Sequence, residues 1–185
     1  MTTFGLASHP PANQMVIVGN STVIYYVGVY LIIRDIQLKS YSQLSKEGGL
    51  HNVTALAAIQ TQKGGLIIAV GESTDARDLP CKISFYFKNK WHVFTDNQTK
   101  GTIKQIQLHE GANYCVSRTD TGNQTNIIDF WNYKSEKLLA QTLIRQQITK
   151  MSIHPKTPKN IVFSGNTYLK LWELFFQQKM MKEAP

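Results

Sequence analysis

Histidine, cysteine and carboxylate side chains supply much of the catalytic and metal-binding chemistry of proteins, and in this sequence they are dispersed. No histidine has a cysteine or a carboxylate partner at metal-ligand spacing. The five histidines are His9, His51, His92, His109 and His154. The sequence also lacks the G-x-x-x-x-G-K-[ST], G-x-G-x-x-G and G-x-S-x-G motifs. We therefore predict no catalytic residues, no metal site and no bound cofactor, and we do not expect an enzyme.

The remaining reactive groups favour structural roles. Cys81 lies near the start of a predicted strand and Cys115 lies inside another, so we expect buried or half-buried thiols in a reducing compartment. His9 and His154 each precede a proline, in the position of a turn at the end of a strand. A structural role is therefore expected for both histidines.

The chain is basic. It has 185 residues, with 20 Lys and Arg against 12 Asp and Glu, and a net charge of +8. The basic residues are scattered, without a run of five like charges, so two interpretations stay open. One is a solvated basic surface. The other is a preference for acidic partners, such as nucleic-acid phosphates or the acidic tails of tubulin, of which we do not expect nucleic acid.

The sequence shows neither a signal peptide nor a membrane span. Its first residues lack a basic start followed by a hydrophobic block. The longest apolar stretch, residues 23–33, is interrupted by Gly28 and is too short to cross a bilayer as a helix. We predict an intracellular protein that does not bind membranes.

Four segments share one pattern, in which apolar and polar residues alternate and a pair of residues follows at the same position. The segments are Y-L-K-L-W-E-L (168–174), I-I-D-F-W-N-Y (127–133), K-I-S-F-Y-F-K (82–88) and L-I-I-R-D-I (31–36). The pairs are Trp172–Glu173, Trp131–Asn132, Tyr86–Phe87 and Arg34–Asp35. Their first positions are separated by 52, 45 and 41 residues. A degenerate Trp-Asp pair recurring at about 40–45 residues is typical of WD40 blades, each a sheet of four strands.

These repeats predict an all-β fold of about four WD40-like blades, forming one incomplete propeller over residues 1–185. The predicted units are 1–49, 50–98, 99–145 and 146–185. We expect complete four-stranded sheets in the second and third units and an incomplete sheet in the fourth. Residues 174–182 could equally form a helical tail. Two predicted inner strands, around residues 53–59 and 103–108, do not alternate cleanly.

A propeller of about four blades would leave exposed edges at both ends. The first lies around Met15 to Ile36 and the last around Ile161 to Leu174, and both have few of the charges or prolines that protect an edge. The candidate interaction edge consists of Leu169, Leu171, Phe175 and Phe176. Unpaired backbone beside apolar side chains would aggregate, so we expect the native state to be a complex.

The order of the motifs resembles that of the WD-repeat cilia- and flagella-associated proteins. The similarity lies in the opening segment from Phe4 through M-V-I-V-G-N-S-T-V-I-Y-Y-V-G-V-Y-L-I-I-R-D-I, in I-I-A-V-G-E followed by K-I-S-F-Y, in I-I-D-F-W-N-Y-K-S-E-K-L-L-A and in T-Y-L-K-L-W-E-L. The resemblance implies tandem propellers that tether or dock inner-arm dynein machinery on doublet microtubules, without catalytic residues. Unlike these proteins, this sequence shows no second propeller and no heptad region, so two alternatives stay open: it is a fragment of a longer protein, or another polypeptide completes the propeller.

The resemblance implies a non-enzymatic scaffold of the ciliary or flagellar axoneme. Its expected partners are other axonemal proteins, with tubulin or dynein-associated subunits among the candidates, within a large complex of the cytoskeleton. The alternative is a WD40 scaffold subunit of a nuclear RNA-processing or ribosome-assembly complex, which the basic charge would also suit.

Overall fold

The computed structural model describes residues 15–50, 52–61, 64–73, 80–94, 99–109, 111, 113–122, 124–175 and 180–183. These residues form strands joined by turns and contain no helix. Accordingly, the described part of the chain has no helical segment that could span a bilayer.

The strands form four antiparallel sheets of four strands each, and within every sheet the strands lie in chain order. Sheet 1 consists of β1 (Met15–Val18), β2 (Thr22–Val27), β3 (Tyr30–Asp35) and β4 (Ser40–Leu44). Sheet 2 consists of β5 (Val53–Gln60), β6 (Leu66–Glu72), β7 (Lys82–Phe87) and β8 (Lys90–Phe94). Sheet 3 consists of β9 (Thr102–Leu108), β10 (Tyr114–Gly122), β11 (Thr125–Asn132) and β12 (Lys137–Ile144). Sheet 4 consists of β13 (Lys150–Ile153), β14 (Asn160–Ser164), β15 (Leu169–Phe175) and β16 (Met180–Glu183).

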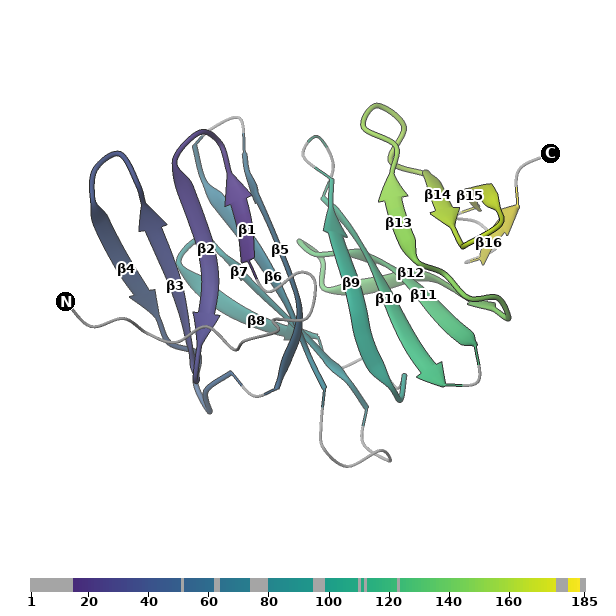
Figure 1. Ribbon diagram of the computed structural model, residues 1–185, viewed down its shortest axis with the longest axis horizontal. Helices are drawn as coiled ribbons and strands as arrows, with labels where there is room; N and C mark the ends of the chain where they lie inside the picture. Colours follow the sequence, from purple (N-terminus) through teal and green to yellow (C-terminus); the bar gives the residue numbers. More distant parts are fainter. Residues whose placement is uncertain are drawn as a thin grey trace.

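The sheets follow one another across the molecule in chain order, so that sheet 1 and sheet 4 lie at opposite ends of an open arc (Figure 1). The first strand of each sheet is the inner one, because β5 contacts β1 on one side and β9 on the other, and β9 also contacts β13. Four-stranded antiparallel sheets arranged around an axis by their first strands are propeller blades.

The hydrophobic core is divided among the three joints between neighbouring sheets. Strand β6 shows why: Ile68 and Val70 pack toward sheet 1, whereas Ile67 and Ala69 pack toward sheet 3. A strand buried on both faces needs a continuous apolar run, which the run from Leu66 to Val70 supplies. Sheets 2 and 3 are thus covered on both faces, while sheets 1 and 4 each have one face that packs against no other sheet of the described chain.

Local geometry explains the two strands that do not alternate cleanly. Each contains a β-bulge: the register shifts between Val53 and Ala55 in one, and opposite Lys104 in the other. In the second case Arg118 pairs with Gln105 and Thr119 pairs with Ile103, so Lys104 is an extra residue. A bulge moves the following side chains to the other face, which produces the one-residue slip seen in the sequence.

The predicted all-β fold with four WD40-like blades in an incomplete propeller is confirmed. The predicted incompleteness of the fourth blade was wrong, because β16 pairs with β15 along Trp172–Phe175 and completes the sheet. The alternative of a helical tail over 174–182 was also wrong: residues 174–175 and 180–182 lie in strands, and residues 176–179 lie outside the described part. Pairing with an existing strand gives the terminal backbone its hydrogen-bond partners, which the local sequence does not reveal.

Candidate interaction surfaces

All four predicted signature pairs lie on the third strand of their sheets. Arg34–Asp35, Tyr86–Phe87 and Trp131–Asn132 end β3, β7 and β11. Trp172–Glu173 instead lies within β15, two residues before its end. The position is therefore shared, although the side chains differ in burial: Trp131 and Phe87 are buried, whereas Arg34 and Glu173 are exposed.

Two of these residues fix the turn that follows their strand. Asp35 Oδ1 accepts a hydrogen bond from the Leu38 N–H at 2.9 Å. Asn132 Oδ1 accepts hydrogen bonds from the N–H groups of Lys134 and Ser135, both at 3.1 Å. Side chains that accept from the backbone two or three residues ahead stabilise turns. Asp35 and Asn132 are thus structural residues of the hairpins.

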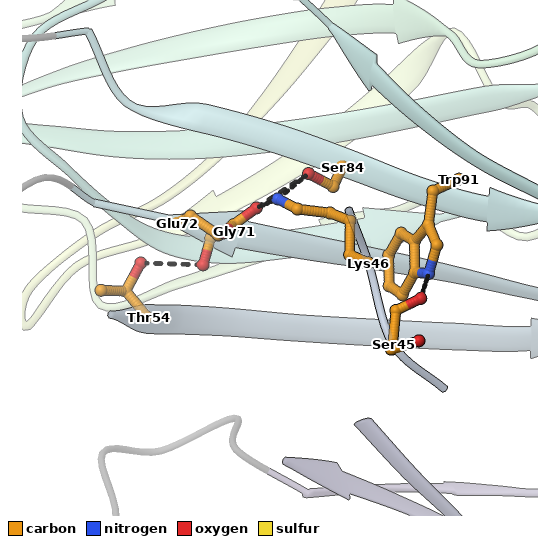
Figure 2. A network of polar contacts seen from close by, with 7 residues as sticks. All are labelled: Ser45, Lys46, Thr54, Gly71, Glu72, Ser84 and Trp91. Atoms are coloured by element: carbon orange, nitrogen blue, oxygen red, sulfur yellow. Dashed lines mark hydrogen bonds and ion pairs between the residues drawn. The ribbon is translucent and has the colours of Figure 1, made fainter. Parts of the chain in front are cut away.

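A polar network joins sheet 1 to sheet 2 (Figure 2). Lys46 follows β4, and its ammonium forms an ion pair with Glu72 at the end of β6. The two side chains are only 9% and 6% exposed. Ser84 on β7 completes the group: it lies 3.1 Å from Lys46 Nζ and donates to Glu72 Oε1 at 2.8 Å. A buried ion pair between neighbouring sheets holds the sheets in one relative position, because moving them apart would leave both charges unpaired.

The joint between sheets 3 and 4 uses side-chain amides. Gln105 on β9 donates from Nε2 to the Met151 carbonyl at 2.8 Å, and its Oε1 accepts the Met151 N–H at 2.9 Å. Gln107 Oε1 accepts the Ile153 N–H at 2.9 Å. These backbone groups belong to the inner strand β13, which has a sheet neighbour on one side only. The two glutamines therefore supply partners to the free edge of β13.

The outward face of sheet 4, which points away from sheet 3, contains three of the four predicted interaction residues. Leu169, Leu171 and Phe175 on β15 are all exposed, Leu169 to 74%. Their strand is not the outermost one: β14 pairs with Leu169–Glu173, and β16 pairs with Trp172–Phe175. The predicted unpaired backbone is therefore wrong for Trp172–Phe175, and the exposed side chains of β15 belong to a sheet face. Phe176 lies outside the described residues.

The outward face of sheet 1 is more apolar. The registers of β1 to β4 place one set of side chains on the face opposite the core. This set consists of Met15, Ile17, Val23, Tyr25, Val27, Tyr30, Ile32, Arg34, Tyr41 and Gln43. Met15, Ile17 and Tyr41 are 57%, 66% and 75% exposed. The central strands β2 and β3 are paired on both sides, whereas β1 and β4 are the edges of this sheet, so the exposed side chains form a face that reaches both edges.

A polar pocket opens where sheet 3 meets the segment that leads into β13. Its volume is about 340 Å³. It is lined by Lys104, Arg118, Asp120, Gly122, Gln124, Asn126, Gln147 and Ile148. The Arg118 guanidinium donates from Nη1 to the Ile148 carbonyl at 2.7 Å and to Asn126 Oδ1 at 3.2 Å. Burial lowers the pKa of Arg118, which a nearby Asp120 carboxylate partly opposes.

One acid is buried in the joint between sheets 2 and 3. Asp129 is fully buried on β11, and burial raises its pKa to about 6. Hydrogen bonds from Gln141, whose Nε2 lies 2.7 Å from Asp129 Oδ1, and from Thr99 act in the opposite direction. The Asp129 Oδ2 atom has no hydrogen-bond partner within the described structure. Asp129 is closed off from solvent, so its perturbed pKa concerns stability.

The other candidate groups have structural surroundings. Cys81 and Cys115 are buried thiols, as predicted, and neither forms a disulfide within the described structure. His154 Nδ1 accepts hydrogen bonds from the backbone at Lys156 and Thr157, which confirms its turn role. His92 and His109 contact Glu136 and the Pro155 carbonyl. His9 and His51 lie outside the described residues. Among the residues described, no group of three His, Cys, Asp or Glu side chains could hold a metal ion.

Sequence reasoning did not identify Lys46, Glu72, Arg118 or Asp129. Two signals were present: Glu72 ends an otherwise apolar strand, and Asp129 interrupts the apolar segment I-I-D-F-W. A charge inside a strand that is buried on both faces requires a partner or a shifted pKa. The partners themselves could not be inferred, since each comes from a distant part of the chain.

Comparison with known proteins adds little beyond the fold. No family model and no curated protein matches the sequence. A chain in the crystal structure of the mitotic checkpoint complex is similar in structure, with 11% sequence identity and a TM-score of 0.45. The match covers 98% of this chain and 78% of that chain. The blade assignment rests on the sheets themselves, and membership of the cilia- and flagella-associated family stays a prediction.

Proposed function

We propose that the protein is a non-enzymatic interaction scaffold whose open arc of blades binds protein partners through its outward faces. The observation that supports this most directly is the outward face of sheet 1. Met15 and Ile17 on β1 and Tyr41 on β4 all lie on this face and are more than half exposed, whereas the opposite face of the same sheet is buried. A contiguous apolar face of this kind on a folded protein marks an interaction site.

The occupant that fits this face best is a further blade. The three joints within the chain have one design, in which the face of one four-stranded sheet packs on the face of the next. The outward face of sheet 1 offers the same kind of surface, with β-branched and aromatic side chains on paired strands. Within this face, β2 and β3 are paired on both sides and offer no backbone hydrogen bonds, so the face itself favours a second sheet over an added strand.

At the finer level we propose a scaffold of the ciliary or flagellar axoneme. The support is the sequence resemblance to WD-repeat cilia- and flagella-associated proteins together with the net charge of +8. Positive charge favours association with acidic surfaces such as the tails of tubulin. Nuclear RNA-processing or ribosome-assembly complexes are the alternative that the same charge would serve.

The face can be tested with matched variants. Ile17→Glu places a charge on the outward face, whereas Leu38→Glu makes the same change in the exposed turn between β3 and β4. We expect the wild-type chain to self-associate or aggregate in size-exclusion chromatography with light scattering. Ile17→Glu should reduce this and Leu38→Glu should not. A monodisperse wild-type monomer with a cooperative melt, or equal behaviour of the two variants, would overturn the proposal.

The proposed role in the axoneme can be tested by the location of the protein in the cell and by the dependence of microtubule binding on charge. A tagged chain expressed in ciliated cells should concentrate in the cilium, and it should sediment with microtubules less well once the acidic tubulin tails are removed. Accumulation in the nucleus, with sedimentation independent of those tails, would instead favour the alternative.

A further inference from the structure

We infer that the polar pocket beside Arg118 is a binding site for the carboxylate side chain of an acidic peptide segment. The inference is independent of the outward faces, because the pocket lies at the joint between sheets 3 and 4, which are packed against each other. It rests on three features: the charges in the pocket, the hydrogen bonds that Arg118 makes, and the way the walls are held.

The charges favour an anion. Lys104 and Arg118 contribute two positive charges to the lining, and among its described residues Asp120 is the acidic one. One oxygen of Asp120 is already used, because Oδ1 accepts the Gly122 N–H at 2.9 Å. Asp120 lies near enough to Arg118 to influence its pKa, yet within the described structure the two side chains form no ion pair. The guanidinium therefore has no carboxylate in contact with it there.

The hydrogen bonds of Arg118 leave part of its guanidinium uncommitted. Both of its hydrogen bonds to the described residues come from Nη1. Nε is buried and has no partner in the described structure. An arginine pairs best with a carboxylate through two parallel N–H groups, and an unpaired buried donor is costly. A ligand carboxylate beside this guanidinium would therefore accept the hydrogen bond that Nε does not make within the described structure.

The walls of the pocket are preformed. Arg118 and Asn126 hold the segment before β13 through the carbonyls of Ile148 and Gln146, at 2.7 and 2.8 Å. From the other side, the Tyr168 hydroxyl donates to the Gln147 carbonyl at 2.9 Å. The bulge at Lys104 adds a residue at the pocket rim. A site built from fixed side chains loses little entropy on binding.

The size and lining favour a peptide over nucleic acid. A pocket of about 340 Å³ accommodates one or two side chains. Polynucleotide binding needs several cations along a track, whereas the described lining of this pocket offers two, Lys104 and Arg118. The side-chain amides of Gln124 and Gln147 can donate to and accept from the peptide groups on either side of an acidic residue.

The test is a titration of the full chain with N-acetyl-glutamate amide, followed by NMR of the Gly122 backbone amide and the Asn126 and Gln147 side-chain amides. N-acetyl-glutamine amide, inorganic phosphate and oligo-dT serve as comparison probes. We expect saturable shifts with the glutamate compound and about tenfold weaker binding of the glutamine compound, the difference expected for a charged hydrogen bond. Equal shifts with both, no shift, or saturation by phosphate or oligo-dT alone would overturn the inference.

Variants distinguish binding by the Arg118 guanidinium from a general effect of positive charge. Arg118→Lys keeps the charge but loses the planar fork, and it should weaken glutamate binding about tenfold. Lys104→Gln, at the exposed rim, should weaken it about threefold without unfolding the protein. Arg145→Lys is the matched control on an exposed arginine that does not line the pocket. Equal loss in Arg118→Lys and Arg145→Lys, or none in both Arg118→Lys and Lys104→Gln, would contradict the assignment.

Discussion

Lys46 and Glu72, which come from sheet 1 and sheet 2, form an ion pair that is almost closed off from solvent. Each charge lowers the free-energy cost of burying the other. Lys46→Met should therefore destabilise the protein by about 3–5 kcal/mol, because it leaves the Glu72 carboxylate without its cation. Urea unfolding measures this, with the exposed Lys134→Met as the control. Replacing both partners, as Lys46→Met with Glu72→Leu, should recover most of the loss; an additive loss would contradict the pairing.

Asp129 makes stability depend on pH. Its pKa is about 6 in the folded protein and close to 3.8 without burial, so the folded state favours the protonated acid. The stabilisation is complete below about pH 4 and is lost as the pH rises through 6. Between pH 4.5 and 7.5 it should fall by about 2 kcal/mol. Asp129→Asn should remove this pH dependence, and the exposed Glu173→Gln should not. An unchanged profile in Asp129→Asn would show that another group is responsible.

Gly71 permits the close approach of sheets 2 and 3. A Cβ atom at this position would lie 2.8 Å from Ile103 Cγ2 and 3.2 Å from Ile106 Cδ1. Gly71→Ala should therefore destabilise the protein by about 1–3 kcal/mol through overpacking. At the exposed Gly111 the nearest atom would be 3.5 Å away, so Gly111→Ala is the control. Thermal melting of the two variants compares them directly, and equal melting temperatures would refute the packing argument.

The Gln105 side chain protects the inner edge of β13. In Gln105→Met the Met151 N–H and carbonyl lose their partners, so the Met151 amide should exchange with deuterium about tenfold faster. The Ile153 amide, which donates to Gln107, reports whether the effect stays local. Gln43→Met on the exposed strand β4 is the control. Unchanged exchange at Met151 would mean that the glutamine bridge is unimportant for holding sheet 4.

The blades could be predicted because their signal is local: alternation along a strand and a recurring residue pair on each third strand. The fourth outer strand could not, since residues 174–182 do not alternate and β16 is defined by its pairing with β15. The alternation of Leu169 and Leu171 predicted exposure on one side, but the stacking of sheets decided that this side is a face. The polar contacts between sheets could not be predicted from the sequence, because Lys46 and Glu72 are 26 residues apart and Gln105 and Met151 are 46 apart.

The irregular stretch around residues 103–108 shows how a defect in a pattern can locate a site. Alternation fails there because Lys104 is inserted by a bulge, and the same insertion places Lys104 at the rim of the Arg118 pocket. Bulges are common beside functional sites because they redirect side chains. The slip in the sequence was thus the one local sign of the pocket.

The two outward faces are chemically unlike. That of sheet 1 is mainly apolar and aromatic, whereas that of sheet 4 interleaves leucines with Lys150, Ser152 and Glu173. The arc therefore has a direction. Contact between two like faces would relate copies by a twofold axis and stop at a pair. Contact between unlike faces adds each further copy by the same rotation, so copies continue to add until the ring of blades closes. The angle between neighbouring sheets then sets the number of blades in the closed ring.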